Sequence, residues 1–382
     1  MALESKKKVL VVGAGFAGAT YARLLAEAGH AVEVIDRRGH IAGNAYDRID
    51  ANANRVHVYG PHLFHTNNPR VVDWLSRFTD WVDYRHRGAA VLADGRFCPL
   101  PINRVTLETV FDCKLDGKAA AEALLKKVAE PVDRPRNAAE FLHGTIGRQL
   151  TDLFYRPYSR KMWGFELENL DKSVVGRLAT RVSDSADYFP NDRYQMLPRA
   201  GYTPLFEAML DHPGINLNLN TPFDKTMERG FDFVFTSMSI DEYHEFCEGP
   251  LPYRSLIFHH RSEGSVPSAV PAPVVNFTDD GPYTRQIYWG LLPGHGNGEA
   301  GPVTVTKEQP CDYADNGFER YYPLKQVDGR PDELYQRYRA MGEKRRGRIK
   351  FIGRCGTYQY LDMHQVVSQS LSGAEKWLRE TP

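Results

Sequence analysis

The chain has 382 residues, 48 Lys and Arg against 48 Asp and Glu, and 42% apolar residues. This length is sufficient for two or three domains with a sizeable core, and the 25% charged and 12% aromatic residues exclude a disordered chain. Because the charges cancel, the composition does not indicate the broad basic surface that binds duplex nucleic acid. The 20 tyrosines favour sites that need a flat apolar ring with a polar tip.

The cysteines and the N-terminal residues indicate the compartment. The five cysteines are scattered and form no CxxC pair, which predicts reduced thiols rather than a disulfide framework or a zinc site. Lys6–Lys8 and the apolar run that follows resemble a secretion signal, but ordered glycines interrupt the run and favour another role. No stretch has the roughly 18 to 20 apolar residues of a membrane helix. We expect a soluble, cytoplasmic protein.

The first forty residues contain a complete nucleotide-binding pattern. Val9–Val12 has the apolar, β-branched composition of a buried parallel strand, and Gly13-Ala14-Gly15-Phe16-Ala17-Gly18 follows at once. A helix with one apolar face is predicted next, ending near Gly29, with its buried positions at Tyr21, Leu24, Leu25 and Ala28. A second strand, 31–35, ends at Asp36. This is the strand–GxGxxG–helix–strand–acid unit that binds dinucleotides.

Each part of this unit has a physical task. Gly13 permits the tight turn, Gly15 lets the backbone approach a pyrophosphate, and Gly18 lets helix and strand pack closely. The helix N-terminus at Phe16 offers N–H groups and partial positive charge to the pyrophosphate. Asp36 is predicted to accept hydrogen bonds from ribose hydroxyls. The alternative is an ordinary βαβ unit without a ligand.

The loop after Asp36 bears on which dinucleotide binds. Arg37-Arg38 and the glycine-containing stretch to Gly43-Asn44 have the form that flavoproteins of the amine-oxidase and glutathione-reductase type use to cover the FAD pyrophosphate. The alternative is that the two arginines bind the 2′-phosphate of NADP. FAD is the preferred prediction.

Sequence patterns in the rest of the chain predict further helices and strands. Residues 119–128 and 138–155 have helical composition and spacing, with Pro131 and Pro135 between them. Runs at 232–236, 255–259, 303–306 and 349–354 read as strands, and 365–379 as a helix with Val366, Leu371, Ala374 and Leu378 buried. We predict an α/β fold with a discontinuous Rossmann-like FAD-binding domain (1–78, 200–246 and 340–382), an inserted helical domain (104–176) and an antiparallel sheet domain (79–103, 177–199 and 247–339).

Many further segments identify a family. They are Gly60–Asn67, Pro101–Asn103, Tyr158–Gly164, Gly201–Thr203, Ile240–Tyr243, Tyr253–Leu256, Tyr283–Arg285, Tyr321–Pro323 and Gly353–Met363. With these segments in this order, the chain resembles the UDP-galactopyranose mutase family from end to end. The resemblance implies an isomerase that interconverts UDP-galactopyranose and UDP-galactofuranose, and so a place in galactofuranose biosynthesis for cell wall or polysaccharide.

The resemblance also implies a mechanism and its cofactors. Reduced FAD is required: flavin N5 attacks the anomeric carbon and UDP leaves, and the sugar ring opens through a flavin iminium, closes as the furanose and takes UDP back. NAD(P)H or another electron donor is the implied external reductant. The partner is a UDP-sugar, with no nucleic acid polymer and no membrane, and a homodimer or higher homo-oligomer is expected.

The family pattern assigns residues to the substrate. Arg177 and Arg285 match the two arginines that neutralise the departing diphosphate, a role suited to guanidinium groups because they bind phosphate oxygens in pairs and stay charged. The other implied substrate contacts are aromatic side chains, with Tyr158 and Trp163 at the uracil and Tyr188, Tyr322 and Tyr360 around the diphosphate and sugar, and the amide of Asn276. Without the family, core packing or a surface ion pair is the simpler interpretation of each.

Two histidines and a C-terminal segment are implied to contact the flavin. His62 and His65 are the remaining implied catalytic residues, since an imidazole beside the flavin can shift its protonation. Further cofactor contacts are implied at Phe16, Arg37, Gly43, Asn44, His62, Leu63, Arg354, Tyr360, Asp362 and Met363. A metal site on His62 and His65 is disfavoured, because Pro61 argues against a helix and no other His or carboxylate cluster completes a ligand set. We expect no metal.

Three places depart from the family pattern. Gln286-Ile287-Tyr288-Trp289-Gly290 and the glycine-rich stretch Leu292–Gly301 follow Arg285 where an acidic–aromatic–basic run is expected. Ser237-Met238 stands where Gly-Pro is expected, and Met162 replaces a glutamine. These differences leave open a mutase for a dTDP-linked or N-acetylated sugar. An FAD oxidoreductase of amine-oxidase type and a flavin-binding scaffold without catalysis also stay open.

Overall fold

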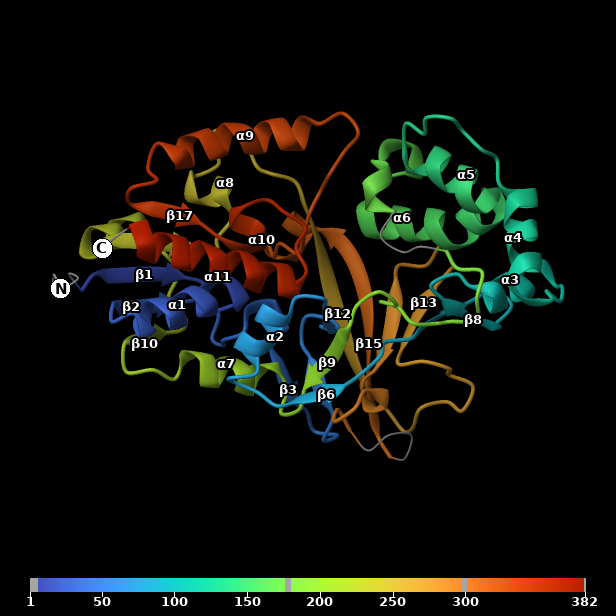
Figure 1. Cartoon of the computed structure of the whole chain (residues 1–382), viewed down its shortest axis with the longest axis horizontal. Helices are drawn as coiled ribbons and strands as arrows, with labels where there is room; N and C mark the ends of the chain where they lie inside the picture. Colours follow the sequence, from blue (N-terminus) through green and yellow to red (C-terminus); the bar gives the residue numbers. More distant parts are fainter. Residues whose placement is uncertain (1–5, 176–179, 297–300, 381–382) are drawn as a thin grey trace.

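The computed structural model describes residues 6–175, 180–296 and 301–380. The molecule has a parallel α/β layer at one end, a helical layer at the other, and a large sheet between them (Figure 1). Strand β1 (Lys8–Val12) and the last helix, α11 (Met363–Glu380), both lie in the α/β layer, although they come from opposite ends of the sequence.

The α/β layer is built on a five-stranded parallel sheet. Its order is β10 (Ile215–Asn218), β2 (Ala31–Ile35), β1, β11 (Phe233–Thr236) and β17 (Ile349–Phe351). The central strand β1 thus pairs with one strand that follows it directly and with another more than two hundred residues later. This arrangement confirms the predicted Rossmann-like fold and its discontinuous chain.

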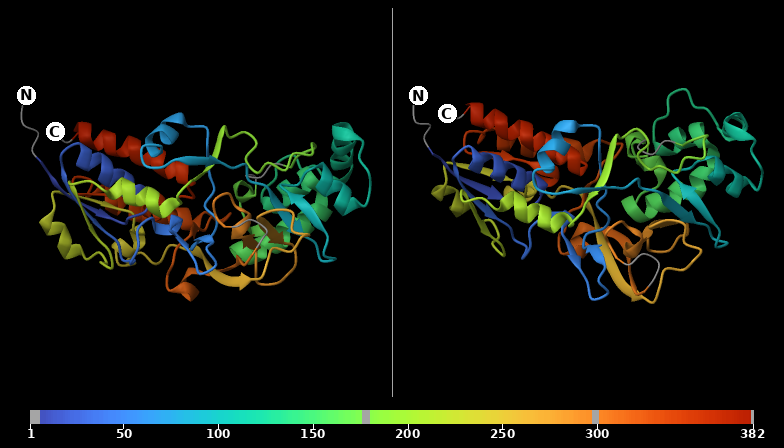
Figure 2. Two further views of the ribbon diagram at one scale, coloured as in Figure 1. Left: turned by 90° about the horizontal axis from the view of Figure 1, so that it is seen from below. Right: turned by 60° about the horizontal axis from the view of Figure 1, so that its bottom comes forward.

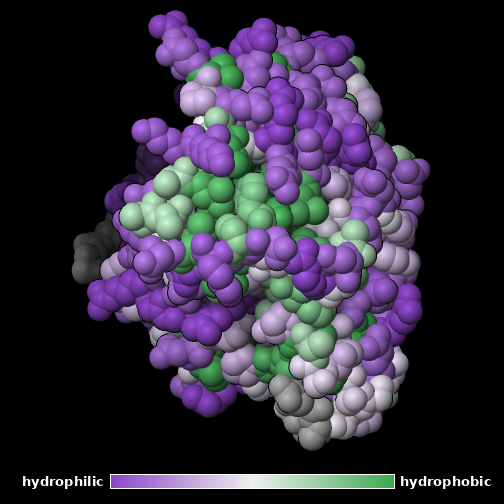
Figure 3. Space-filling model, turned by 90° about the vertical axis from the view of Figure 1, so that its right-hand side faces the viewer, coloured by the Kyte–Doolittle hydropathy of each residue, from purple (hydrophilic) through white to green (hydrophobic). Residues whose placement is uncertain are grey.

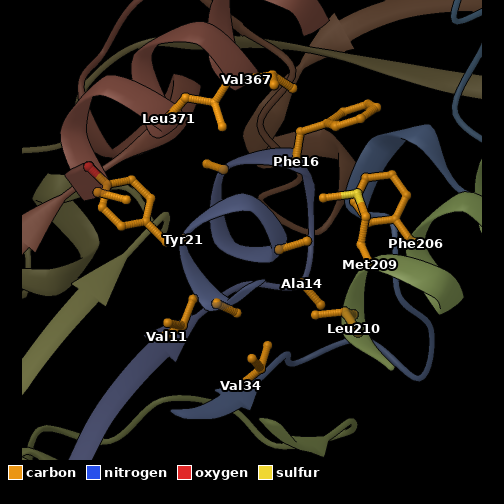
Figure 4. Close-up of a cluster of buried hydrophobic side chains, with 14 of the residues drawn as sticks. Val11, Ala14, Phe16, Tyr21, Val34, Phe206, Met209, Leu210, Val367 and Leu371 are labelled. Carbon is orange, nitrogen blue, oxygen red and sulfur yellow. The ribbon is translucent and has the colours of Figure 1, made fainter. Parts of the chain in front are cut away.

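Helices cover both faces of this sheet. On one face α1 (Phe16–Glu27), α7 (Tyr202–Leu210) and α11 pack over Val9 and Val11, and Figure 4 shows their side chains converging around α1. On the other face Leu10 and Val12 pack beneath a 3-10 segment, Lys225–Gly230, and the short helix α8 (Ile240–Tyr243). The predicted burial of this strand on both faces is therefore confirmed.

Two of the predicted helix faces need correction. Ala28, predicted to be buried, is exposed, because α1 ends at Glu27 and Ala28 is its C-cap. In α11 the buried positions are Val367, Ser370, Leu371, Ala374 and Trp377, whereas Val366 and Leu378 are only partly buried. The helix begins two residues earlier than predicted, and its indole at Trp377 reaches the sheet between Phe233 and Phe235.

The central layer is a seven-stranded sheet. Its order is β16 (Tyr322–Pro323), β12 (Tyr253–Glu263), β15 (Val303–Asp312), β14 (Arg285–Tyr288), β13 (Val274–Phe277), β7 (Gly88–Val91) and β8 (Phe97–Leu100). The pairs are antiparallel as predicted, except that β13 and β7 run parallel. Two small antiparallel sheets join the layers: β3 (Asp47–Ile49) with β4 (Arg55–His57), and β5 (Phe64–Thr66), β9 (Tyr194–Pro198) and β6 (Trp81–Asp83).

The helical layer confirms the predicted inserted segment. It contains α3 (Arg104–Phe111), α4 (Gly117–Val128), α5 (Ala138–Leu150), a π-helical turn (Thr151–Tyr155) and α6 (Arg156–Trp163) around their own apolar core. Figure 2 shows this layer at the end opposite to α1 and α11. Seen end-on, it presents a group of apolar side chains bordered by hydrophilic ones (Figure 3). The domain limits proposed from the sequence remain a prediction.

The remaining helices border the α/β layer: α2 (Pro69–Leu75), α9 (Arg330–Glu343) and α10 (Gly353–Gly356). All five cysteines lie in the described part of the chain as free thiols, as predicted. Within the described ranges, none of the helices combines the length and apolar content that crossing a bilayer requires.

Candidate active site

A cavity of about 1020 Å³ lies where the three layers meet. Its walls come from the stretch before β5, the end of α6, strands of the central sheet and the chain after α10. Fourteen of the sequence-predicted site residues line it: Asn44, His62, Leu63, His65, Tyr158, Trp163, Tyr188, Asn276, Arg285, Tyr322, Arg354, Tyr360, Asp362 and Met363. The structure therefore brings together residues that are up to 319 positions apart (from Asn44 to Met363).

The other predicted residues lie elsewhere. Gly13, Gly15, Phe16, Gly18, Asp36 and Gly43 form the turn between β1 and α1 and its surroundings, beside the cavity rather than in its wall. Arg37 is on the surface, where its guanidinium pairs with Glu319 at 2.9 Å. Arg177 lies outside the described residues.

The glycine turn has the geometry expected of a phosphate-binding loop. Gly13 has φ +103°, and a Cβ on Gly18 would lie 1.8 Å from the Gly13 carbonyl oxygen, so both positions require glycine. The first turn of α1 begins at Gly15, which offers no side chain to cap it. The N–H groups there are consequently able to bind an anion.

Asp36 has a second task besides the predicted one. Its Oδ2 accepts the Ala14 N–H at 2.8 Å and its Oδ1 accepts the Arg38 N–H at 2.9 Å. The carboxylate thus fastens the glycine turn to the end of β2. A carboxylate has about four acceptor sites, so acceptor capacity remains for ribose hydroxyls.

Arg38, rather than Arg37, points toward the interior. Its guanidinium donates to Asn44 Oδ1 at 2.8 Å, lies 4.5 Å from the centre of the Tyr59 ring and also pairs with Glu319. Asn44 and Tyr59 both line the cavity. Of these two neighbouring arginines, Arg38 is therefore the one that contacts the cavity wall.

The main cation of the described wall is Arg285 on β14. Its Nε donates to Oε2 of Glu308 at 2.6 Å, from the directly opposite position of β15. Burial is the largest single influence and disfavours the charge, but the charge and hydrogen bond of Glu308, together with the phenols of Tyr322 and Tyr158, raise the pKa of Arg285. Glu308 is 2% exposed, and its Oε1 has no hydrogen-bond partner among the described residues. The Arg285 guanidinium therefore stays protonated in the cavity wall, with the Glu308 carboxylate beside it as its counter-charge.

Aromatic rings stand beside this charge. Tyr322 and Tyr360 are stacked with centroids 5.3 Å apart and planes 16° apart, and Trp163 meets Tyr322 edge-on at 6.3 Å. The Arg354 guanidinium lies 5.5 Å and 5.3 Å from the two tyrosine ring centres. This arrangement suits a ligand with both an aromatic base and phosphates.

Helix α6 brings two aromatic side chains to the cavity. Tyr158 and Trp163 lie near its two ends, and Arg254 of β12 holds its C-terminus by donating to the carbonyl oxygens of Met162 at 2.8 Å and Lys161 at 3.1 Å. Met162, which departs from the expected glutamine, is 5% exposed and lines the cavity. The departure thus adds apolar surface to this wall.

His62 is held in one neutral tautomer. Its Nδ1 lies 2.8 Å from the Gly60 carbonyl, which can only accept, so Nδ1 carries the proton and Nε2 keeps its lone pair. Burial, aided by the charges of Arg354 and Arg285, lowers the pKa of His62 to about 4. Near neutral pH, His62 is an acceptor in the cavity wall.

His65 belongs to a different group. Its Nδ1 lies 2.6 Å from Asp192 Oδ2, and its ring stacks on Phe189 with centroids 3.6 Å apart. His65, Asp362 and His364 each offer one ligand atom, and these atoms lie within 4.8 Å of one another. The expectation that nothing near His65 could complete a ligand set is therefore wrong, since the fold supplies Asp362 and His364. His62 is not part of this group, and the absence of a metal stays a prediction.

Among the residues that sequence reasoning missed, Glu308 lies behind the cavity wall as the partner of Arg285, and His86 lies in the wall itself. Glu308 carries no local signal, because its partner Arg285 is joined to it only by strand pairing. His86 is 5% exposed, lies 3.1 Å from the Tyr84 hydroxyl through Nδ1, and lines the cavity next to Tyr188. Burial, with the nearby charge of Arg285, lowers the pKa of His86 to about 3, so it is neutral. Its backbone carbonyl also accepts the Tyr188 N–H at 2.8 Å.

The charged and aromatic groups of this wall indicate the kind of ligand that the cavity suits. A protonated guanidinium, stacked phenols and two neutral imidazoles suit an anionic ligand with aromatic character, and the uncapped N–H groups of the adjacent glycine turn suit a phosphate group.

Comparison with known proteins identifies related chains. The sequence profile described as UDP-galactopyranose mutase matches residues 153–360, and that of an NAD(P)-binding Rossmann-like domain matches residues 11–78. A Klebsiella pneumoniae protein named "Probable UDP-galactopyranose mutase" is 33% identical over 380 residues, covering 98% of this chain and 95% of its own. The dTDP-fucopyranose mutase of Escherichia coli is 32% identical over 382 residues, covering 97% and 98%.

Solved structures show the same fold. A crystal structure of reduced UDP-galactopyranose mutase aligns with a TM-score of 0.76 at 17% identity, covering 98% of this chain and 94% of that one. A putrescine oxidase aligns with a TM-score of 0.58 at 14% identity, covering 98% of this chain and 99% of that one.

Proposed function

Because the chain belongs to the UDP-galactopyranose mutase family, we propose that it interconverts UDP-galactopyranose and UDP-galactofuranose with the help of reduced FAD. The reaction is an isomerisation in which the nucleotide leaves the sugar and returns. The observation that carries the proposal is the position of Arg285 in one cavity wall with Tyr158, Trp163 and Tyr322.

The cavity residues have distinct tasks toward a UDP-sugar. Arg285 binds the diphosphate and stabilises the charge that appears when the bond to the sugar breaks, and the charge stays because Glu308 holds it. Arg177 is proposed as the second cation. Trp163 and Tyr158 border the uracil, and Tyr322 donates its hydroxyl toward the phosphates.

The opposite side of the site fits FAD. The uncapped start of α1 at Gly15 suits the pyrophosphate, and Asp36 has acceptor capacity for the ribose. The part of the cavity where the isoalloxazine would lie is lined by Asn44, His62, Leu63, Arg354, Asp362 and Met363. Reduced flavin supplies the nucleophile that the anomeric carbon needs. His62, held as an acceptor at Nε2, can take a hydrogen bond beside it.

The direct test uses the chain with its flavin reduced by dithionite. Incubation with UDP-galactofuranose is expected to yield UDP-galactopyranose, separated by chromatography, whereas the oxidised protein is inactive. Absence of conversion by the reduced, flavin-loaded protein would remove the galactose assignment. NAD(P)H in place of dithionite tests the proposed physiological reductant.

One observation keeps a second sugar as an alternative substrate. The identity to the dTDP-fucopyranose mutase, 32%, nearly equals the 33% to the Klebsiella protein. Running the same assay with dTDP-fucofuranose and with an N-acetylated UDP-sugar ranks the substrates by kcat/KM. A preference above tenfold for either would replace UDP-galactose in the proposal.

An oxidase of the putrescine-oxidase type makes a different use of the flavin. Such an enzyme has no electrostatic need for Arg285 in its substrate cavity, since its substrate is a cation. Stoichiometric reduction of bound flavin by an amine, with uptake of oxygen, would support the oxidase and contradict the mutase.

A further inference from the structure

The glycine-rich stretch after β14 does not line the cavity at the positions that the structure describes; it packs behind the wall. Trp289 is fully buried and donates its indole N–H to Thr306 Oγ1 at 2.6 Å. The chain then turns so that His295, 2% exposed, faces the interior, and the His295 carbonyl accepts the Arg55 N–H at 2.8 Å. This departure from the family pattern therefore places a histidine in the core.

His295 begins a chain of hydrogen bonds that ends at the cavity. Its Nδ1 lies 2.9 Å from the Pro293 carbonyl, and its Nε2 lies 2.9 Å from Nε2 of His57. The other nitrogen of His57, Nδ1, accepts the backbone N–H of His62 at 3.0 Å. We call His295, His57 and His62 the histidine relay.

The donors and acceptors of the histidine relay fix every proton. His57 Nδ1 accepts from a peptide N–H, so its proton is on Nε2 and is donated to His295 Nε2. His295 then carries its proton on Nδ1 and donates it to Pro293. The rings of His57 and His295 are therefore neutral, because a second proton on either of them would place two N–H groups against each other.

His62 is thereby held on both sides of its backbone. His57 accepts its N–H, and the Tyr202 hydroxyl donates to its carbonyl at 3.0 Å. With Nδ1 also engaged by Gly60, the ring has one orientation, and Nε2 is the nitrogen left for a ligand. The relay therefore connects a loop behind the sheet to the orientation of one acceptor atom.

We propose that His295 is a positioning residue for the mutase reaction: acting through His57, it holds His62 with Nε2 ready to accept a hydrogen bond at the flavin. This inference rests on the proposed function. It assigns a purpose to the stretch that departs from the family pattern, namely support of the cofactor side of the site rather than contact with the sugar.

The test compares two substitutions at His295. His295→Leu removes the acceptor for His57, whereas His295→Gln keeps a side-chain carbonyl that can accept. His295→Leu is expected to lower kcat about tenfold, because the His62 acceptor would no longer be held in position for the reaction. KM is expected to change by less than about threefold, because no substrate contact is removed. His295→Gln is expected to restore most of kcat. His259→Leu, on β12 outside the cavity wall, is the matched control and is expected to behave as the parent.

A second measurement does not depend on turnover. Long-range ¹H–¹⁵N spectra of protein with labelled histidine report which ring nitrogen carries the proton. The parent should show the proton of His62 on Nδ1 and that of His57 on Nε2, and His295→Leu should alter the signals of both. An inactive parent would defeat the proposed function, whereas unchanged His62 signals in His295→Leu, an undiminished kcat, or equal losses in the Leu and Gln variants would overturn the positioning role.

Discussion

The pairing of Arg285 with Glu308 makes the guanidinium the most informative side chain to change. Arg285→Ala would leave Glu308 buried and unpaired, which costs about 3 to 5 kcal/mol of stability and obscures any effect on activity. Arg285→Lys keeps the charge but has no planar fork to bind Glu308 and a phosphate at once.

We expect Arg285→Lys to lose about 2 to 3 kcal/mol of transition-state stabilisation, measured as kcat/KM for the UDP-sugar, while bound FAD stays near the parent level. Arg193→Lys, at a surface arginine that lies against Tyr194, is a suitable control. Equal activity of Arg285→Lys and the parent would exclude Arg285 from diphosphate binding.

At the scale of elements, α1 can pack closely against the turn after β1 only because residue 18 is a glycine and has no Cβ. In Gly18→Ala the new Cβ would lie 1.8 Å from the Gly13 carbonyl oxygen, which cannot move without breaking the turn. We expect a loss of about 1 to 3 kcal/mol in the free energy of unfolding and a reduced FAD content, measured by urea denaturation and flavin absorbance.

Gly264→Ala is the matched control, since a Cβ there meets no described atom within 4 Å and its φ is not positive. If Gly18→Ala, like Gly264→Ala, kept the stability and FAD content of the parent, the close contact between Gly18 and the Gly13 carbonyl oxygen would not explain the glycine at position 18.

Elements built from local patterns are the ones that the sequence predicts well. Strand β1, the glycine turn and α1 follow from spacing within 30 residues, and their bounds agree with the structure to within one or two residues. Glu308 and His295 are not predictable in this way, for a physical reason. Their roles depend on partners 23 and 238 residues away, brought close by strand pairing and a buried loop. The cavity aromatics were predicted through the family resemblance, because a tyrosine alone does not distinguish core from site.

For the whole molecule, buried neutral histidines predict sensitivity to acid. The pKa of His62 is lowered to about 4 and that of His86 to about 3, in both cases chiefly by burial, and burial also lowers those of His57 and His295. Below about pH 6.5 the unfolded chain binds protons that the folded chain does not, so stability falls as the pH drops from about 6.5 toward 4.

Each such histidine contributes a slope of up to about 1.4 kcal/mol per pH unit. The urea midpoint is therefore expected to be lower at pH 5 than at pH 7, and His86→Gln should show a shallower decline than the parent. A midpoint that did not change between these pH values would show that the histidines titrate normally in the folded protein.

The position of β1 between β2 and β11 has a consequence for synthesis on the ribosome. The neighbour β11 is made about two hundred residues after β1, β17 a further hundred later, and α11, which packs on α1, last of all. Until β11 has been made, β1 can pair only with β2, and the apolar face that α11 covers stays exposed until nearly the whole protein has emerged. We expect a chain released before residue 349 to aggregate or be degraded, so truncation near the C-terminus removes the N-terminal nucleotide site as well.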